Sequence, residues 1–425
     1  MRAQGASDEM AVQTPESVGM TSEPLLRIRG ALEGYVRQGL VPCAQAIVFR
    51  RGHVVLAETL GWSSIERRAP LRADAIFRLY SMTKPVVGVA VMMLHQAGQL
   101  GLHDPVAAYL PEFASMQVLC GDQLVAAKRP ITLHDLLTHT AGLSYHFLLD
   151  DKVAPLYQAQ GLLDNWTVQA SGMPLAAYVT RLASLPLRAH PGTQWCYSEA
   201  MNVLGRVVEA VSKERFGTFV KRRILDPLHM NDTDFHVSPE RKERLVEVYE
   251  VAPEGSLLAC SDRLGFDHPP SADFGGSGLV GTAADYLRFA RMLLNGGELE
   301  GVRLLDPDMT KRIVTNHLGP EFGERPLHAM PGGLWAEPGV GHGYCGVVVK
   351  DPKARGIPGS AGEYSWAGAA NTNFWVDFAQ ELIVIVMSQV FPGESRARDI
   401  HDQVRALVYE AIPSGDGRAC GQAAR

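Results

Sequence analysis

The chain has 425 residues, which is long enough for more than one hydrophobic core. Its composition, with 46% hydrophobic and 20% charged residues, is typical of a soluble globular protein. A formal net charge of -6 excludes the basic field that attracts nucleic acid or anionic membranes. All uninterrupted apolar runs are shorter than the ~20 residues that a membrane span needs.

The first 20 residues are polar, have Arg2 as their only basic residue and lack the apolar core of a secretory signal. We therefore expect a cytoplasmic protein without a nucleic-acid or membrane partner, whose oligomeric state the sequence leaves open. No two of the six cysteines form a C-x-x-C pair, so we expect free thiols that mostly pack in the interior. These residues are Cys43, Cys120, Cys196, Cys260, Cys345 and Cys420.

Both ends of the chain have the pattern of a helix combined with antiparallel strands. The first part predicts an amphipathic helix, a strand and the start of a second strand after a turn, at Leu25–Gln38, Ala44–Arg50 and Val54–Ala57. The last part predicts a second hairpin and a closing helix, at Asn373–Asp377, Leu382–Met387 and Glu394–Ala411. The tail from Ser414 is glycine-rich and predicted to be disordered.

The middle of the chain is mostly helical by pattern. The predicted helices are Val86–Gly98, Leu133–Thr138, Leu175–Leu182, Ala200–Ser212 and Ala283–Asn295. We therefore expect an α/β domain built from residues 15–85 and 290–425, with a mostly helical domain of residues 86–289 inserted. The active site is expected in the cleft between the two.

Ser81 and Lys84 are three residues apart at the start of an apolar helical run, so both project from one helix face. Pro85 fits only the first helical turn, where the backbone donors lack partners anyway, and this places the helix start near Ser81. A hydroxyl at the positive end of a helix, one turn from an amine, suits covalent acyl transfer. In the structural alternative, Ser81 is an N-cap and Lys84 an exposed lysine.

A lysine acts as a base only when it is neutral, so its pKa must fall from about 10.4 to near 7. Burial or a second cation lowers the pKa of an amine in this way. Alternatively, the lysine cation lowers the pKa of a nearby tyrosine, and the phenolate takes the serine proton. The two groups would titrate as a coupled pair, so the identity of the proton acceptor stays open. In either case a tyrosine should face Ser81.

Several segments, in order, resemble the serine β-lactamase superfamily, and most closely the class C β-lactamases and the family VIII carboxylesterases. Pro191–Gly205 is similar to the family's Pro-Gly-Thr…Tyr-Ser segment. Three further similar segments are Phe77–Lys84, Leu136–Leu143 and Gly275–Tyr286. Ordered motifs along nearly the whole chain, from about Glu23 to Gln389, are far more specific than one tetrapeptide.

The resemblance implies a class C β-lactamase-like fold, in which an antiparallel sheet is flanked by N- and C-terminal helices and a mostly helical domain is inserted. It assigns the nucleophile to Ser81 and the proton-transfer pair to Lys84 and Tyr197. It also places the oxyanion hole at the backbone N–H groups of Ser81 and Ala369. Neither a metal nor an organic cofactor is implied.

A third motif separates the two subclasses. β-Lactamases carry Lys-Thr-Gly on the strand beside the nucleophile, whereas this chain has Trp366, Ala367 and Gly368, which resembles the Trp-x-Gly of family VIII esterases. A lysine there would attract the carboxylate of a β-lactam, while a tryptophan offers an apolar wall to an uncharged acyl or alcohol group. Gly368 allows the strand backbone to approach a substrate closely.

Other residues near these motifs have structural alternatives. Tyr145 and Phe147 are candidates to line the substrate pocket, although packing explains them equally well. Glu199 stands where β-lactamases have Asn, and we expect it to point away as a surface carboxylate. His139 is expected to have a structural hydrogen-bonding role, and Cys196 lacks the histidine pattern of a cysteine nucleophile.

We therefore predict a family VIII-type carboxylesterase that hydrolyses short- to medium-chain esters through an acyl-enzyme on Ser81, with scope for weak cephalosporin hydrolysis. The alternatives are a β-lactamase or DD-peptidase-like enzyme, an acyltransferase that uses an alcohol or amine, and a non-catalytic penicillin-binding-like sensor. A sensor would be expected to lose the lysine or the tyrosine. An α/β-hydrolase needs Gly-x-Ser-x-Gly and a zinc hydrolase needs clustered ligands, and neither pattern occurs.

Overall fold

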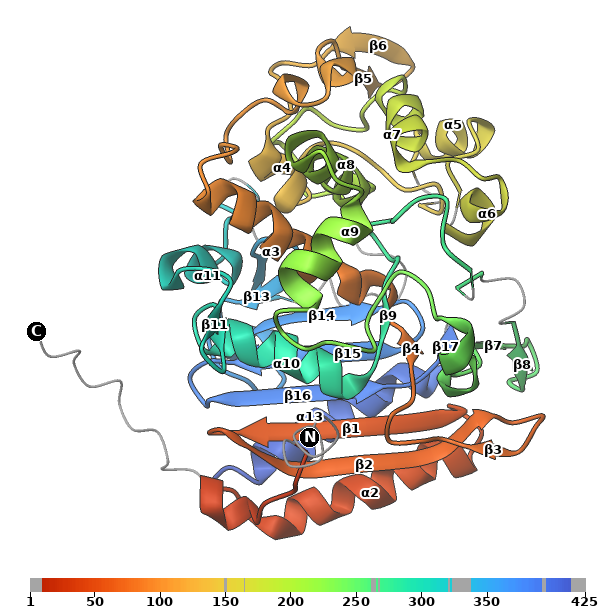
Figure 1. Cartoon of the computed structure of the whole chain (residues 1–425), viewed down its shortest axis with the longest axis vertical. Coiled ribbons are helices and arrows are strands. Elements are labelled where there is room, and N and C mark those ends of the chain that lie inside the picture. Colours follow the sequence, from red (N-terminus) through yellow and green to blue (C-terminus); the bar gives the residue numbers. More distant parts are fainter. Residues whose placement is uncertain are drawn as a thin grey trace, which may run out of the picture.

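One antiparallel sheet of eight strands joins the two ends of the chain in this computed structural model (Figure 1). The structure describes residues 10–148, 151–163, 165–260, 265–266, 268–319, 322, 338–391 and 395–413. In sheet order the strands are β12 (Val340–His342), β13 (Val347–Val349), β14 (Tyr364–Gly368), β15 (Thr372–Asp377), β16 (Leu382–Met387), β1 (Cys43–Arg50), β2 (His53–Ser64) and β3 (Ala69–Pro70). Because β16 pairs with β1, the C-terminal hairpin continues the N-terminal one.

The central strands are buried on both faces. Along β16, Ile383 and Ile385 contribute to the larger core, whereas Val384 and Val386 contribute to a second core on the other face. Successive side chains of a strand point to opposite faces, so a strand covered on both sides needs apolar residues at every position. This explains why these strands read as continuous apolar runs in the sequence.

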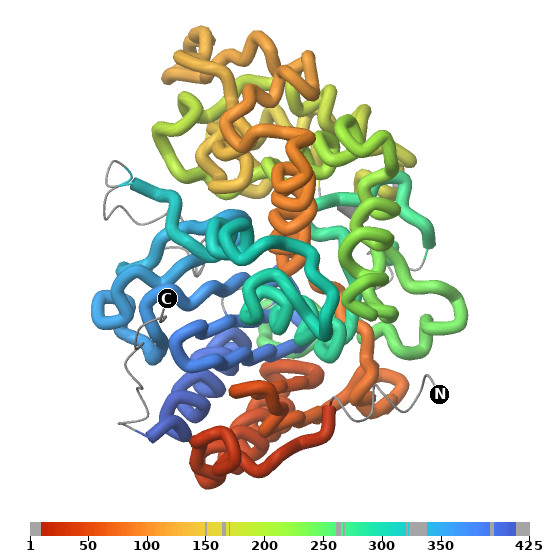
Figure 2. Tube along the Cα trace, turned by 60° about the vertical axis from the view of Figure 1, so that its left-hand side comes forward, coloured from red at the N-terminus to blue at the C-terminus, as the bar shows by residue number. Residues whose placement is uncertain are grey.

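Helices from the two ends of the chain cover one face of the sheet. Helix α2 (Ser22–Arg37) packs against α13 (Asp399–Glu410), and both contribute to the second core. In Figure 2 the N-terminal segment (red) and the C-terminal segment (blue) lie together in the lower part of the molecule. On the other face, α3 (Thr83–Gln96) and α10 (Ala283–Leu294) belong to the larger core, and α10 contacts β16.

A mostly helical region lies beyond α3 (Figure 1). Its helices are α4 (Leu133–Leu137), α5 (Ala154–Ala159), α6 (Asn165–Ala170), α7 (Leu175–Ala183), α8 (Ala200–Ser212) and α9 (Phe216–Val220). Helix α8 contacts α3, α4 and α7 and so connects this region to the helix that follows Ser81. None of the helices in the described part of the chain is long and apolar enough to cross a membrane.

Short elements complete the chain. They are the helices α11 (Pro307–Ile313) and α12 (Pro352–Arg355) and the strands β4 (Phe77–Arg78), β5 (Gln117–Cys120), β6 (Gln123–Ala126), β7 (Tyr249–Val251), β8 (Leu257–Ala259), β9 (Val280–Gly281), β10 (Glu298–Leu299), β11 (Val302–Arg303) and β17 (Val390–Phe391). Strand β4 pairs with β9, so the glycine-rich segment Gly275–Tyr286, which contains β9, lies beside the residues that lead to Ser81.

The predicted fold class, an α/β sheet with an inserted helical region, is confirmed, and helix α8 has its predicted bounds. The closing helix begins later than predicted, because Arg396–Arg398 form a separate 3-10 turn that is capped by Ser395. Glu394, the predicted start of this helix, and the tail from Ser414 lie outside the described residues. The division into residues 15–85 with 290–425 and residues 86–289 remains our proposal.

Candidate active site

Ser81 lies in a 3-10 turn, Tyr80–Met82, that runs directly into helix α3. The preceding Tyr80 has a φ of 45°, a left-handed conformation that is unfavourable for a bulky residue. The Tyr286 hydroxyl, which belongs to helix α10, donates a hydrogen bond of 2.9 Å to the Met82 carbonyl and holds the turn in place. A strained backbone that the surrounding structure enforces is common where a nucleophile is presented.

The structure brings together the three residues that the sequence proposed as catalytic. The Ser81 Oγ lies 2.6 Å from the Tyr197 hydroxyl oxygen, and Lys84 Nζ donates to the same Oγ at 2.9 Å. Lys84 Nζ also donates to the Gly276 carbonyl at 2.7 Å. The serine hydroxyl therefore contacts both groups that could accept its proton.

Burial has opposite effects on these two groups. It lowers the pKa of Lys84 to about 7, although the charges of Glu199 and Cys345 act in the other direction. Burial raises the pKa of Tyr197 well above that of a free phenol, although its hydrogen bond with Ser81 opposes this. Near neutral pH Lys84 is thus the member of the pair that loses its proton, while Tyr197 remains a phenol in contact with the nucleophile.

The loop that carries Tyr197 is fixed by His139. The Cys196 N–H donates to the His139 carbonyl at 2.7 Å, and His139 Nδ1 lies 3.3 Å from the Ser198 hydroxyl. Burial keeps the pKa of His139 well below its usual range, so the ring is neutral and has the structural role expected of it. Burial also raises the pKa of Cys196 to about 11, which makes this thiol a poor nucleophile.

Strand β14 lies against the nucleophile turn. A Cβ at Gly368 would lie 2.4 Å from the Leu79 carbonyl and 2.2 Å from Thr372 Oγ1, so only glycine fits this close approach. The Trp366 ring is 2% exposed, and its centroid lies 6.0 Å from that of Tyr197. Ala369 follows the strand directly, and its N–H remains our predicted oxyanion donor.

A stacked pair of aromatic side chains, Tyr145 and Phe147, lies beside Tyr197. The Tyr145 ring centroid lies 5.0 Å from that of Tyr197, and the Phe147 ring stacks on Tyr145 at 4.7 Å. Tyr145 is buried, whereas Phe147 is 37% exposed. Tyr145 packs beside Tyr197 and is hydrogen-bonded to it, and Phe147 presents an apolar surface to solvent. That these two residues line the substrate pocket stays a prediction.

The expectation that Glu199 is a surface carboxylate is wrong, because its side chain is 3% exposed. Its backbone N–H donates to the Ser144 carbonyl at 3.1 Å, and its carboxylate accepts a hydrogen bond from Asn202 Nδ2. Burial raises the pKa of Glu199 to about 7. The contributions of Asn202 and Gly276 were missed, although both residues lie in segments that resemble the family.

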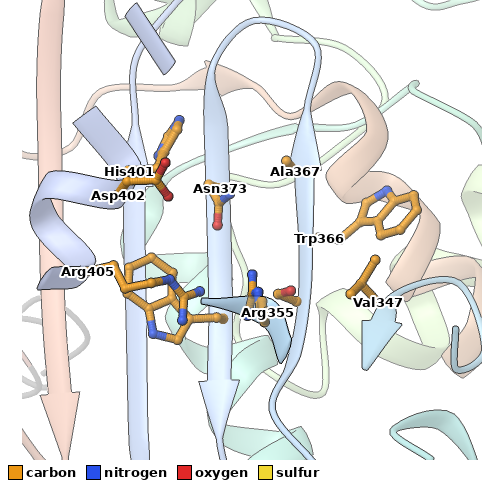
Figure 3. Close-up of a pocket in the computed structure, with 10 residues that line it drawn as sticks. Val347, Arg355, Trp366, Ala367, Asn373, His401, Asp402 and Arg405 are labelled. Carbon is orange, nitrogen blue, oxygen red and sulfur yellow. The ribbon is translucent and has the colours of Figure 1, made fainter. Parts of the chain in front are cut away.

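A small cavity lies behind the site, between helix α13 and strands β14 and β15 (Figure 3). Its volume of about 20 Å³ has room for little more than one water molecule. In Figure 3 the Trp366 indole lies on the other side of β14 from His401 and Arg405, although Trp366 also contributes to the lining of the cavity. Within the described ranges, no group of three or more His, Cys, Asp or Glu side chains could hold a metal ion.

Comparison with known proteins identifies the family of this chain. The chain is 34% identical over 367 residues to Protein Rv1367c of Mycobacterium tuberculosis, covering 84% of this chain and 88% of that protein. It is 31% identical over 379 residues to Esterase EstB of Burkholderia gladioli, covering 85% and 89%. The solved structure of EstCE1, a hydrolase with promiscuous acyltransferase activity, superposes with a TM-score of 0.78 at 25% identity, covering 91% and 99%. The sequence profile of the Beta-lactamase family matches residues 28–408, so this chain belongs to the Beta-lactamase family and has its class C-like fold.

Proposed function

We propose that this protein is a serine carboxylesterase that hydrolyses short- to medium-chain carboxylic esters through an acyl-enzyme on Ser81. The observation that carries this proposal is the contact of Ser81 Oγ with both Tyr197 and Lys84. An esterase and a hydrolase among its relatives support the same chemistry. Since all three groups are in place, a non-catalytic sensor role is disfavoured.

In the proposed reaction, Ser81 Oγ attacks the ester carbonyl carbon, and its proton passes to the Tyr197–Lys84 pair. The backbone N–H groups of Ser81 and Ala369 stabilise the tetrahedral oxyanion by roughly 3 kcal/mol each. The pair then returns the proton to the leaving alcohol, which leaves an acyl group on Ser81. Water, activated by the same pair, attacks this acyl group and releases the acid.

The surroundings of the site favour an uncharged substrate over a β-lactam. Trp366, which is almost fully buried, stands where β-lactamases carry the lysine that attracts a carboxylate, and Phe147 supplies exposed apolar surface. An acyl chain gains about 0.8 kcal/mol for each methylene that it buries against such surfaces. We propose that ester hydrolysis is the main activity and that cephalosporin hydrolysis is at most a weak side activity.

The experiment that tests this function compares p-nitrophenyl butyrate with a chromogenic cephalosporin. We expect kcat/KM for the ester to exceed that for the cephalosporin, and the reverse order would contradict the esterase assignment. Ser81→Ala should abolish ester hydrolysis and covalent labelling by a fluorophosphonate. Ser184→Ala, at an exposed serine after helix α7, is the matched control and should behave as the wild type.

Acyl transfer to an alcohol is the second candidate, because EstCE1 is described as a hydrolase with promiscuous acyltransferase activity. Hydrolysis and transfer share the acyl-enzyme on Ser81 and differ in what attacks it. A series of acyl-chain lengths with and without a competing alcohol separates them. Formation of the new ester at the expense of the acid would favour the transferase assignment.

A further inference from the structure

A continuous chain of hydrogen bonds connects Lys84 to Glu199. Lys84 Nζ donates to the Gly276 carbonyl at 2.7 Å, and the Gly276 N–H donates to Asn202 Oδ1 at 2.8 Å. Asn202 Nδ2 in turn donates to the Glu199 carboxylate. At each step the donor lies on the lysine side and the acceptor on the carboxylate side, so the three hydrogen bonds run in one direction from Lys84 through Gly276 and Asn202 to Glu199.

The residues that join these two groups are buried. Lys84, Asn202 and Glu199 are each 3% exposed or less, so solvent screens their charges weakly. The Asn202 amide has one orientation that satisfies both neighbours, with its oxygen on the Gly276 N–H and its nitrogen on the carboxylate. The chain therefore places the Glu199 charge in fixed relation to Lys84.

Four tyrosines surround Glu199. Tyr178 from helix α7 is hydrogen-bonded to the Glu199 carboxylate. The Glu199 charge also raises the pKa of Tyr145, Tyr157 and Tyr197. Lys84 from helix α3 faces it, and the Cys345 thiol in turn faces Lys84. Burial has the largest effect on both charged groups, and Lys84 is the cation among these neighbours of Glu199.

Building on the proposed function, we propose that Glu199 is a positioning residue whose negative charge sets the pH at which the Lys84–Tyr197 pair can accept the proton of Ser81. Two arrangements of the site have no net charge, a lysine cation with a carboxylate and a neutral amine with a carboxylic acid. Moving one proton between the two groups interconverts these arrangements without leaving an uncompensated buried charge.

The electrostatics around both groups support this role. Burial lowers the pKa of Lys84 and raises that of Glu199, and each reaches about 7. The Glu199 charge stabilises the lysine cation, so the pKa of Lys84 is higher than it would be with burial alone. Removing the carboxylate should let Lys84 release its proton at lower pH, and the competent form of the enzyme should persist into more acidic solution.

The test is the pH dependence of the rate at which a fluorophosphonate labels Ser81. In Glu199→Gln we expect the acidic limb of this profile to move to lower pH by about one pH unit or more. Glu199→Asp keeps the charge and should keep the limb close to its wild-type position. Glu254→Gln, at an exposed turn between β7 and β8, is the matched control and should leave the profile unchanged.

An unshifted acidic limb in folded Glu199→Gln would overturn the inference, as would an equal displacement in Glu199→Asp. If Glu199→Gln does not fold, a displaced limb in Glu199→Asp still overturns the inference, because the proposal requires that limb to stay in place. Labelling does not depend on ester turnover. A wild-type enzyme that is labelled but hydrolyses no ester would contradict the proposed function, while the pH profiles of labelling would still test the role of Glu199. A wild-type enzyme that is not labelled would contradict both the proposed function and the role of Glu199.

Discussion

Two buried glutamates show how differently this protein uses interior charge. Glu363, which precedes strand β14, is fully buried and accepts hydrogen bonds from Arg355 at 2.9 Å and from Arg405 at 2.7 Å. Glu199, near the nucleophile, is almost as buried and has an amide, a phenol and the more distant Lys84 as partners. One carboxylate is clamped between cations, and the other is not.

The pKa values of the two carboxyl groups follow from this difference. Burial acts to raise both, but at Glu363 the two guanidinium groups outweigh it and hold the pKa below its ordinary value. At Glu199 burial prevails, and the pKa rises to about 7. Burial alone thus does not make a charge functional; the cations in contact decide whether a carboxylate stays fixed or titrates.

The largest expected effect separates activity from stability at Lys84. Lys84→Met should lower kcat/KM for p-nitrophenyl butyrate by about 10²- to 10⁴-fold, because the serine loses its proton acceptor. The free energy of unfolding should change little, because Glu199, with a pKa of about 7, can take up a proton when the lysine cation is removed and so leaves no uncompensated buried charge. Steady-state kinetics and urea unfolding measure the two. A loss of activity below tenfold would show that Tyr197 works without the lysine.

The clamped glutamate should show the opposite behaviour. Arg405→Met leaves Glu363 with an incomplete ion network, and we expect unfolding to become easier by about 3–5 kcal/mol. The kcat/KM of the folded fraction should remain near the wild-type value. Arg396→Met, which breaks the exposed pair with Asp399, is the matched control and should cost less than about 1 kcal/mol. Equal losses in the two variants would contradict the distinction between the two kinds of charge.

Two histidines, the buried His342 and the partly buried His401, should make both faces of the sheet sensitive to acid. Burial lowers the pKa of His342 and of His401 to about 3, so the unfolded chain binds their protons first as the pH falls below about 6.5. The contribution of these histidines to stability should therefore be complete above about pH 6.5 and decline toward pH 3, by about 1.4 kcal/mol per pH unit for each histidine. Urea unfolding between pH 7 and 4.5 measures the slope.

A pair of variants isolates the contribution of one histidine to this slope. His342→Gln should reduce the slope, whereas His53→Gln, at an exposed histidine of strand β2, should leave it unchanged. The same slope in both variants would mean that other groups, such as buried carboxyls, control acid unfolding.

The smallest expected effect concerns the edge of the site. Phe147→Ala removes an exposed ring beside Tyr145, and we expect KM for p-nitrophenyl butyrate to rise by up to about tenfold with little change in kcat. The free energy of unfolding should change by less than about 0.5 kcal/mol. Leu258→Ala, another exposed apolar residue, is the control. An unchanged KM would place the acyl chain elsewhere.

The sequence allowed the main elements and the catalytic trio to be predicted for physical reasons. Strands covered on both faces appear as unbroken apolar runs, and helices with one buried face repeat every three to four residues. Ser81 and Lys84 are adjacent on one turn, so their relation follows from local geometry. Tyr197 lies far from Ser81 in the sequence, so local geometry does not relate the two residues. Its role could be predicted only from the ordered family motifs.

The surroundings of these residues could not be predicted in the same way. The hydrogen bond from Lys84 to Gly276 spans 192 positions of the chain, and no local pattern encodes it. Glutamates are rarely buried without a partner, so a surface position is the ordinary expectation for Glu199. Its inward orientation depends on the Ser144 carbonyl and on Asn202, which only the folded chain brings together.

The close contact at Gly368 has a consequence for redesigning the enzyme. Because a side chain there would collide with the Leu79 carbonyl, this position offers no room for tailoring substrate preference. In a mutant library, most substitutions at Gly368 would therefore give variants that misfold or in which strand β14 is displaced from the Ser81 turn. Phe147, which is partly exposed and packs mainly on Tyr145, is the better starting point for changing the range of accepted acyl groups.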